Sequence, residues 1–150
     1  MSLFKPACLL AVLLAGAVAC NKNGPPPPNP GYRYFEVAKK VPPEDWRDSA
    51  FVVATRDSAL LQQIDSQLTL PIAQRKIVNG ALAGGSASYN TNGTHVFKWH
   101  FMEDDWALAD VSAEIFDGRP YTDVDVNLAY WLDTVKRFAP WGFYIRKEVK

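Results

Sequence analysis

The sequence is poor in cysteine and has no excess of either charge. Its 150 residues include only two cysteines, Cys8 and Cys20, and 16 basic side chains balance 16 acidic ones. A balanced charge argues against a nucleic-acid partner, because such proteins concentrate basic groups on one surface. It also gives no reason to expect that strongly charged substrates are steered toward the protein.

The sequence also lacks a hydrophobic run long enough to cross a membrane. The N-terminal apolar run, residues 7–16, falls well short of the roughly 20 residues that a spanning helix needs. Lys5 precedes this run, and Ala17-Val18-Ala19 follows it directly before Cys20, as is typical of a cleavable export signal. The segment resembles the signal peptides of bacterial lipoproteins, in which the cysteine is lipidated and becomes the mature N-terminus. We therefore expect residues 1–19 to be a lipoprotein signal peptide and Cys20 to carry the lipid.

The residues around Cys20 leave two modes of cleavage open and favour one of the two membranes of a Gram-negative envelope. Ala17 stands where lipoprotein signals usually carry leucine, so an ordinary cut after Ala19 stays open and would leave a periplasmic or secreted protein. Lipidation removes what would otherwise be the only thiol in an oxidising compartment, because Cys8 is lost with the signal. By resemblance to Gram-negative lipoproteins, Asn21 in place of aspartate favours the outer membrane. Because only one cysteine remains after cleavage, the mature domain cannot form an internal disulfide, and side-chain packing alone must stabilise it.

Composition divides the mature chain into a tether and one domain. Residues 20–31 join the lipidated cysteine to a proline-rich spacer that includes Pro25-Pro26-Pro27-Pro28. Consecutive prolines favour polyproline II, which would make the spacer roughly 30 Å long. A stalk of tuned length and a generic linker explain it equally well. Residues 32–48 follow as an N-terminal extension able to pack on the domain, and residues 49–150 suffice for one small domain, not two.

Hydrophobic periodicity predicts an α+β domain. Short apolar or alternating segments predict strands at residues 51–55, 76–83, 95–102, 107–116 and 142–149. Apolar residues three and four apart predict two amphipathic helices, one with Leu60, Leu61, Ile64 and Leu68 and one with Val124, Leu128, Trp131, Val135 and Phe138. The order is β-α-β-β-β-α-β, with an acidic turn at Glu103-Asp104-Asp105. We expect a two-layer sandwich in which both helices cover one face of an antiparallel or mixed sheet.

Motifs of familiar catalytic, phosphate and metal sites are absent from the sequence. There is no Gly-x-Ser-x-Gly or Ser-x-x-Lys motif, and Gly84-Gly85 lacks the continuation of a phosphate-binding loop. His95 and His100 fall on opposite faces of an alternating strand, so together they are not expected to bind one metal ion. We expect neither a metal nor another cofactor. A lone strand histidine more often hydrogen-bonds its neighbours than performs chemistry.

A polar loop and the acidic turn form the candidate ligand surface. The glycine-rich loop at residues 84–93 and the turn after His100 combine backbone freedom, acidic groups and an aromatic side chain. The candidate residues are His100, Glu103, Asp104, Trp106 and Asp117. Trp106 is the tryptophan that we expect to be exposed, whereas Phe97, Trp99 and Phe101 are expected mainly to pack in the core.

These observations favour a lipid-anchored envelope protein that displays a small, non-enzymatic recognition domain. Its partners would be the membrane, through the N-terminal lipid, and a protein or glycan ligand of the cell envelope, but not nucleic acid. An enzyme is the runner-up and would need His100 with Glu114 or Asp117 in one cleft. A purely structural envelope lipoprotein is the third possibility.

An ordered series of motifs, several of them centred on tryptophan, runs through about two-thirds of the chain: Phe51-Val-Val-Ala-Thr55, Val78-Asn79-Gly80, Trp99-His100-Phe101, Trp106, Asp117-Gly118, Tyr130-Trp131-Leu132 and Pro140-Trp141. The series resembles a small domain family named after the N-terminal module of a calmodulin-binding protein. This resemblance implies a stand-alone α+β module and brings no established activity; calmodulin binding belongs to the name of one member. Members usually carry cysteines at the positions of Phe116 and Ala139, so the resemblance also implies that these two side chains are in contact.

Overall fold

The computed structural model describes residues 31–112 and 118–149. Several expectations fall outside this part of the chain and stay predictions. They concern the signal peptide, lipidation at Cys20, the proline-rich tether, Glu114, Asp117 and the contact between Phe116 and Ala139.

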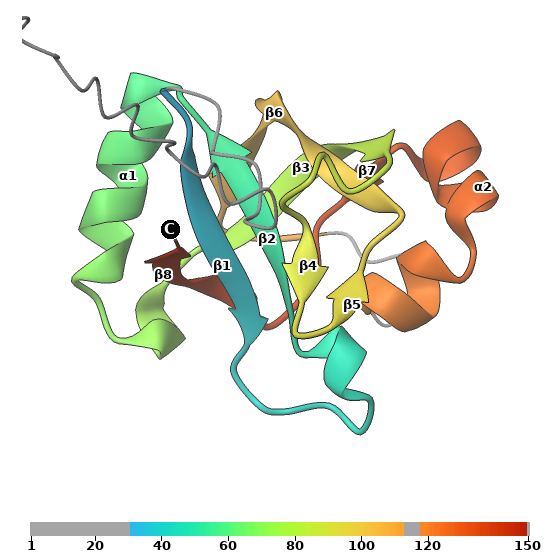
Figure 1. The fold of residues 1–150 in the computed structure, drawn as a ribbon. Coiled ribbons are helices and arrows are strands. Elements are labelled where there is room, and N and C mark those ends of the chain that lie inside the picture. The colour runs from blue at the N-terminus through green and yellow to red at the C-terminus, as the bar shows by residue number, and fades with distance from the viewer. Residues whose placement is uncertain (1–30, 113–117, 150) are drawn as a thin grey trace, which may run out of the picture.

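Antiparallel strands build the body of the domain (Figure 1). The described strands are β1 (Arg33–Lys39), β2 (Ala50–Thr55), β3 (Ile77–Gly84), β4 (Thr91–Asn92), β5 (His95–Val96), β6 (Trp99–Ala109), β7 (Arg137–Phe138) and β8 (Phe143–Val149). The main sheet has the order β2-β1-β8-β3-β6, and β7 also pairs with β3. β4 and β5 form a separate hairpin. The predicted α+β class with an antiparallel sheet is confirmed.

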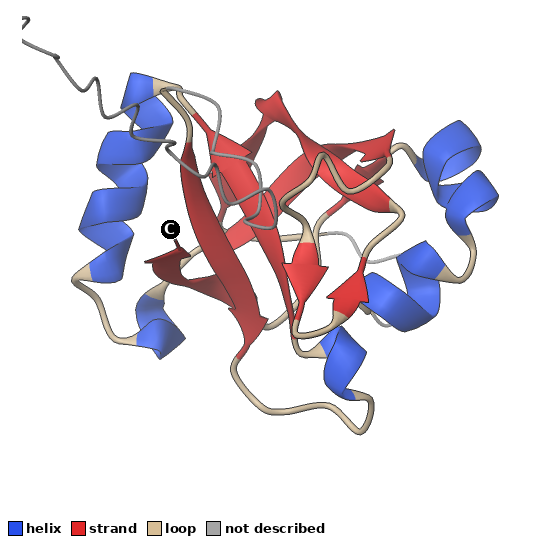
Figure 2. Ribbon diagram, in the orientation of Figure 1, coloured by secondary structure: helices blue, strands red, loops and turns tan. Residues whose placement is uncertain are grey.

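Besides the short 3-10 helices Trp46–Asp48 and Ile72–Gln74, two longer helical segments flank the strands in the described part of the chain (Figure 2). α1 (Ser58–Leu68) begins where Asp57 Oδ1 accepts a hydrogen bond from Leu60 N at 2.7 Å, and it buries Leu60 and Ile64. The second segment consists of a wide π-type turn (Pro120–Asp125), the short α2 (Leu128–Tyr130) and another wide turn (Trp131–Val135). Figure 1 places α1 and α2 on opposite sides of the strands, so the two helices do not cover one face together as predicted.

The sheet begins earlier in the chain than we expected. β1 lies between β2 and β8, with Phe35 opposite Val53 on one side and Glu148 on the other. Phe35 and Val37 are fully buried because they alternate with outward-facing polar residues. The segment assigned to an extension therefore supplies an interior strand, and the folded domain starts near residue 33, not at residue 49.

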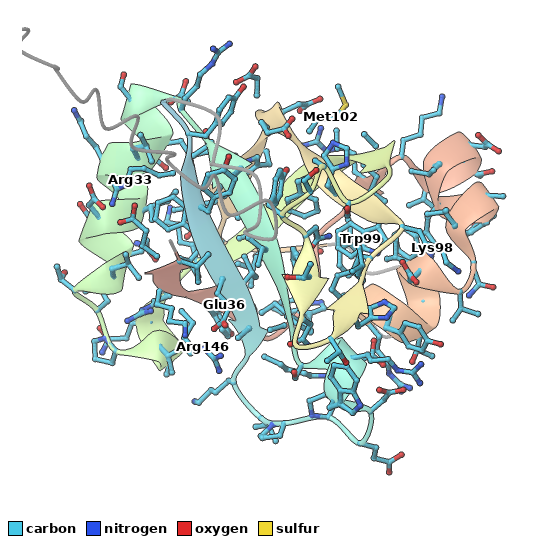
Figure 3. All side chains as sticks on the ribbon, in the orientation of Figure 1. Arg33, Glu36, Lys98, Trp99, Met102 and Arg146 are labelled. Atoms are coloured by element: carbon cyan, nitrogen blue, oxygen red, sulfur yellow. The ribbon has the colours of Figure 1, made fainter. Side chains whose placement is uncertain are left out.

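Ion pairs on the molecular surface connect β1 to α1 and to β8. Arg33 bonds to Asp65 of α1 and to Glu148 of β8, each at 2.8 Å. These hydrogen bonds hold the pKa of the Asp65 carboxyl below its usual range. Glu36 pairs with Arg146, and Figure 3 shows both side chains on the face of β1 and β8. The first and last strands thus lie side by side along their length.

β6 contains a wide bulge where an acidic turn was predicted. Gly80 pairs with Trp106 and Leu82 with Phe101, so residues 102–105 stand opposite the single residue Ala81. Ala81 pairs instead with Arg137 of β7. Met102 of the bulge points away from the body of the molecule (Figure 3). The strands predicted at residues 95–102 and 107–116 are therefore corrected: residues 95–96 form the short β5, and residues 99–109 form one long strand, β6.

The second helical segment ends sooner than its apolar spacing predicts. Lys136 has a φ of 65°, a left-handed conformation that stops the helix after Val135. Phe138 therefore lies on β7, and not on the helical stripe to which we assigned it. The core explains this outcome, because Phe138 is buried there with its ring 5.4 Å from that of Trp131.

Aromatic side chains dominate the core. The Phe51 ring lies 5.3–6.0 Å from the rings of Trp99, Phe101, Phe138 and Phe143. Phe97, Trp99 and Phe101 are all at most 1% exposed. The expectation that this row packs in the core is confirmed.

Side chains bridge the two outer strands of the sheet, β2 and β6. Asn90 accepts from Val52 N at 2.9 Å and donates to Trp99 O at 2.8 Å, while its own side chain is fully buried. Trp106 Nε1 donates to Ala54 O at 2.7 Å. The expectation that Trp106 is exposed is wrong, since its indole is 6% exposed and satisfies the edge of β2. These two side chains thereby connect β2 and β6, which stand at the two ends of the sheet order, by side-chain hydrogen bonds and not by backbone pairing.

Gly80 has no Cβ atom, and the Phe101 ring occupies the space where a Cβ atom would lie. A Cβ atom at position 80 would lie 2.4 Å from Phe101 Cδ2, far inside van der Waals contact. We expect Gly80→Ala to lower the free energy of unfolding by about 2 kcal/mol through overpacking. Urea denaturation followed by tryptophan fluorescence measures the change. Adding Phe101→Leu should recover part of the loss caused by the alanine; equal costs of Gly80→Ala in both backgrounds would contradict the clash.

Candidate functional site

The glycine-rich loop contacts the outer side of β6. His100 Nδ1 lies 2.6 Å from Gly85 O, and because a carbonyl can only accept, Nδ1 is the donor of this hydrogen bond. The Tyr89 hydroxyl lies 3.1 Å from both Phe101 O and Glu103 Oε1. His100 and Glu103 are thus held in place by contacts with the loop.

Tyrosines extend this surface beyond the residues that we predicted. The ring of Tyr89 lies 5.3 Å from that of Tyr34 and 6.1 Å from that of His100. We call Tyr32, Tyr34, Tyr89, His100 and Glu103 the tyrosine surface. At its rim Arg56 stacks over Tyr32 and lies 3.8 Å from Asp104.

Only part of the predicted site belongs to the tyrosine surface. His100 and Glu103 belong to it and Asp104 lies at its rim, whereas Trp106 points into the core. Asp117 lies outside the described residues, as does Glu114 of the alternative catalytic pair. Tyr32 and Tyr34 were missed, although their alternation with Phe35 and Val37 is a sequence signal for outward-facing positions.

The Tyr89 phenol is unusually hard to ionise. Burial raises its pKa well above the usual value, and the nearby Glu103 carboxylate raises it further. Because the folded-state pKa exceeds the unfolded value of about 10, the associated stability is complete below that pH and is lost as the pH rises.

We therefore expect an ultraviolet titration of tyrosinate to reveal one tyrosine that ionises only at a pH well above the others or on unfolding. Tyr89→Phe should remove this late step and reduce the alkaline loss of stability. The matched variant Tyr130→Phe changes an exposed ring and should leave the late step in place. A late step that survives in Tyr89→Phe would contradict the assignment.

A second polar cluster joins the β4–β5 hairpin to the turn at residues 120–125. His95 Nε2 lies 3.4 Å from Asp125 Oδ2, and the two side chains are 18% and 1% exposed. Asp125 Oδ1 accepts from Lys98 N at 2.6 Å. The rings of Phe97 and Tyr121 contact His95 edge to face. Asp125 thus connects the hairpin to the turn at residues 120–125.

The turn at residues 46–48 supports the same cluster. Asp48 is buried and accepts hydrogen bonds from Tyr121 N, Thr122 N and Thr122 Oγ1 at 2.7, 2.9 and 2.5 Å. The Arg47 guanidinium lies over the Tyr121 ring, 3.7 Å from its centroid. Arg47 also hydrogen-bonds Asp45 and holds the pKa of that carboxyl below its usual range. These contacts fix the start of the second helical segment.

The described residues contain neither a metal-binding group of side chains nor a membrane-spanning helix. No group of three or more histidine, cysteine, aspartate or glutamate side chains in residues 31–112 and 118–149 is arranged to hold a metal ion. Within the same ranges no helix is both long enough and apolar enough to span a membrane.

Comparison with known proteins identifies the domain but no relative of known function. Residues 31–150 match the family model described as the BP-74 N-terminal domain. Neither the curated proteins nor the solved structures contain a significant match to the chain.

Proposed function

The chain belongs to the BP-74 N-terminal domain family, and from that premise we propose that residues 31–150 act as a non-enzymatic recognition module. Its ligand would be a protein or a glycan of the cell envelope. The tyrosine surface would be the binding site, with Asp104 and Arg56 at its rim.

One observation carries this proposal: polar and aromatic groups on one face are preorganised by contacts inside the domain. The Tyr89 hydroxyl and the His100 ring are each hydrogen-bonded to a backbone carbonyl, yet both side chains remain partly exposed. Groups held in this way lose little conformational entropy when a ligand binds. Tyrosine adds a large contact area with a polar end, which suits both peptides and sugars.

We also propose that the module is displayed from the outer membrane on a lipidated tether. The support is the signal-like segment before Cys20, the proline-rich spacer after it and the absence of aspartate at position 21. Mass spectrometry of the N-terminal peptide of the native protein tests this directly. A peptide that begins at Asn21, or one with an unmodified Cys20 thiol, would contradict lipid anchoring.

The binding role can be tested with paired variants of the exposed rings. The chain from residue 20, with Cys20→Ser, is immobilised and offered envelope protein and glycan fractions. We expect Tyr89→Ala combined with His100→Ala to reduce ligand capture by about tenfold, as for a central contact residue. Trp141→Ala, an exposed ring outside this surface, is the control and should change capture less than about twofold.

The outcomes separate the candidate functions. Equal capture by all variants would contradict a ligand site at the tyrosine surface. Conversion of a captured ligand by the wild-type chain, lost on His100→Ala, would instead favour the enzymatic alternative. In that alternative His100 Nε2 is the basic nitrogen, because Nδ1 donates to Gly85 O.

A further inference from the structure

We propose that the tyrosine surface binds the protein's own proline-rich segment, residues 22–30. The inference goes beyond the recognition of an external ligand and does not depend on it. It rests on ring geometry, on charge and on the place where the segment joins the domain.

The ring arrangement suits a polyproline II helix. Tyr34, Tyr89 and His100 form a row with centroids 5.3 and 6.1 Å apart, and neighbouring rings are inclined by 63° and 80°. A polyproline II helix returns to the same side every third residue, roughly 9 Å farther on. Pro25 and Pro28 have this spacing, so they would contact rings toward the two ends of the row. Such segments bind aromatic surfaces well because they are extended before binding.

The charges are complementary. Lys22 is the only charged residue among residues 21–30, and it stands three positions before Pro25. Glu103 belongs to the tyrosine surface, and Asp104, whose side chain is 65% exposed, lies at its rim. With Pro25 toward the His100 end of the row, the lysine ammonium would lie on the side of β6, the strand that also carries these carboxylates.

The connection to the domain places the segment beside its binding surface. Tyr32 and Tyr34 belong to the surface and follow Gly31 almost directly. Gly31 has a φ of 103°, a conformation open mainly to glycine, so the chain enters β1 through a bend and not in line with the strand. Pro28 is within roughly 9 Å of Gly31 along a polyproline II path. A short connection gives the segment an effective concentration of order millimolar, which compensates for a weak contact.

Docking of this kind would make the tether a competitor for the recognition surface. An external ligand would have to displace the prolines, and displacement would release the spacer to its full extension. Ligand binding would then be coupled to the extension of the spacer that carries the domain.

Nuclear magnetic resonance of the chain from residue 20, with Cys20→Ser, tests the proposal. The main variant replaces Pro25-Pro26-Pro27-Pro28 with Gly-Ser-Gly-Ser, and Asn29→Ser is the matched control that keeps these prolines. We expect the main variant to shift the ring signals of Tyr89 and His100, and the control to leave them in place. A synthetic peptide of residues 21–30, added at millimolar concentration to the main variant, should return the signals to the wild-type positions. The same peptide with Lys22→Glu should need several times more.

Unchanged Tyr89 and His100 signals in the Gly-Ser variant would overturn the inference. Shifts that the peptide does not reverse would also overturn it, because they would arise from an indirect change in the domain. Either result would leave the binding of an external ligand to be decided by its own capture experiment. Conversely, loss of external capture would not affect the response to the peptide.

Discussion

Replacing Asp48 with alanine is expected to lower the free energy of unfolding by about 4 kcal/mol. The carboxylate is 1% exposed and accepts hydrogen bonds from Tyr121 N, Thr122 N and Thr122 Oγ1. Alanine would leave these half-buried donors without their partner. Because the turn at residues 120–125 is held by this side chain, we also expect its amides to exchange faster with solvent.

Conservative and distant variants make this prediction specific. Asp48→Asn keeps the shape and one carbonyl oxygen but puts an amide donor where a carboxylate oxygen accepted, so about half of the loss should remain. Asp104→Ala removes an exposed carboxylate and should change stability by less than about 0.5 kcal/mol. Denaturation in urea measures all three. A cost of Asp48→Ala as small as that of Asp104→Ala would contradict the buried hydrogen-bond network.

Replacing Asn90 with alanine is expected to cost about 3 kcal/mol. Its amide is fully buried and satisfies Val52 N on β2 and Trp99 O on β6 at once. Alanine would leave an unpaired donor and an unpaired acceptor facing each other across a small cavity. The effect should appear in hydrogen exchange at Val52, whose amide would lose its protection relative to the rest of β2.

An acidic variant of the same position separates the two hydrogen bonds. In Asn90→Asp the new side chain would still accept from Val52 N, but as a carboxylate it would face Trp99 O with no proton to donate. We therefore expect this variant to be at least as damaging as alanine near neutral pH and to recover in acid, where a protonated side chain could donate. Costs of both variants below about 1 kcal/mol would show that the outer strands hold together without Asn90.

The sequence correctly predicted the elements whose burial pattern is contained in a few neighbouring residues. The spacing of Leu60 and Ile64 and the cap at Asp57 describe α1 correctly, because helix position and burial follow a simple period. β2, β3 and β8 were also recognised from short apolar runs. β1 was missed because Phe35 and Val37 are its only large buried side chains and two prolines follow soon after. Its interior position depends on pairing with β8, at the far end of the chain.

The bulge and the bridged strands depend on contacts that no local pattern contains. The acidic residues of β6 indicated a break, but the strand continues because Trp106 pairs with Gly80 beyond it. Trp106 is buried because its indole donates to a carbonyl 52 positions earlier in the sequence. Likewise, Tyr89 looked like part of a polar loop, and only the fold places it between Tyr34 and His100.

The pairing of Tyr34 with Val149 means that the start of β1 and the end of β8 lie next to each other. A short peptide could join these two points, and new termini could then be opened in the exposed bend around Lys40 and Val41. The same closeness would let the whole domain be grafted into a surface loop of a host protein. It also means that a fluorescent tag fused after the last strand would lie close to Tyr34 at the start of β1.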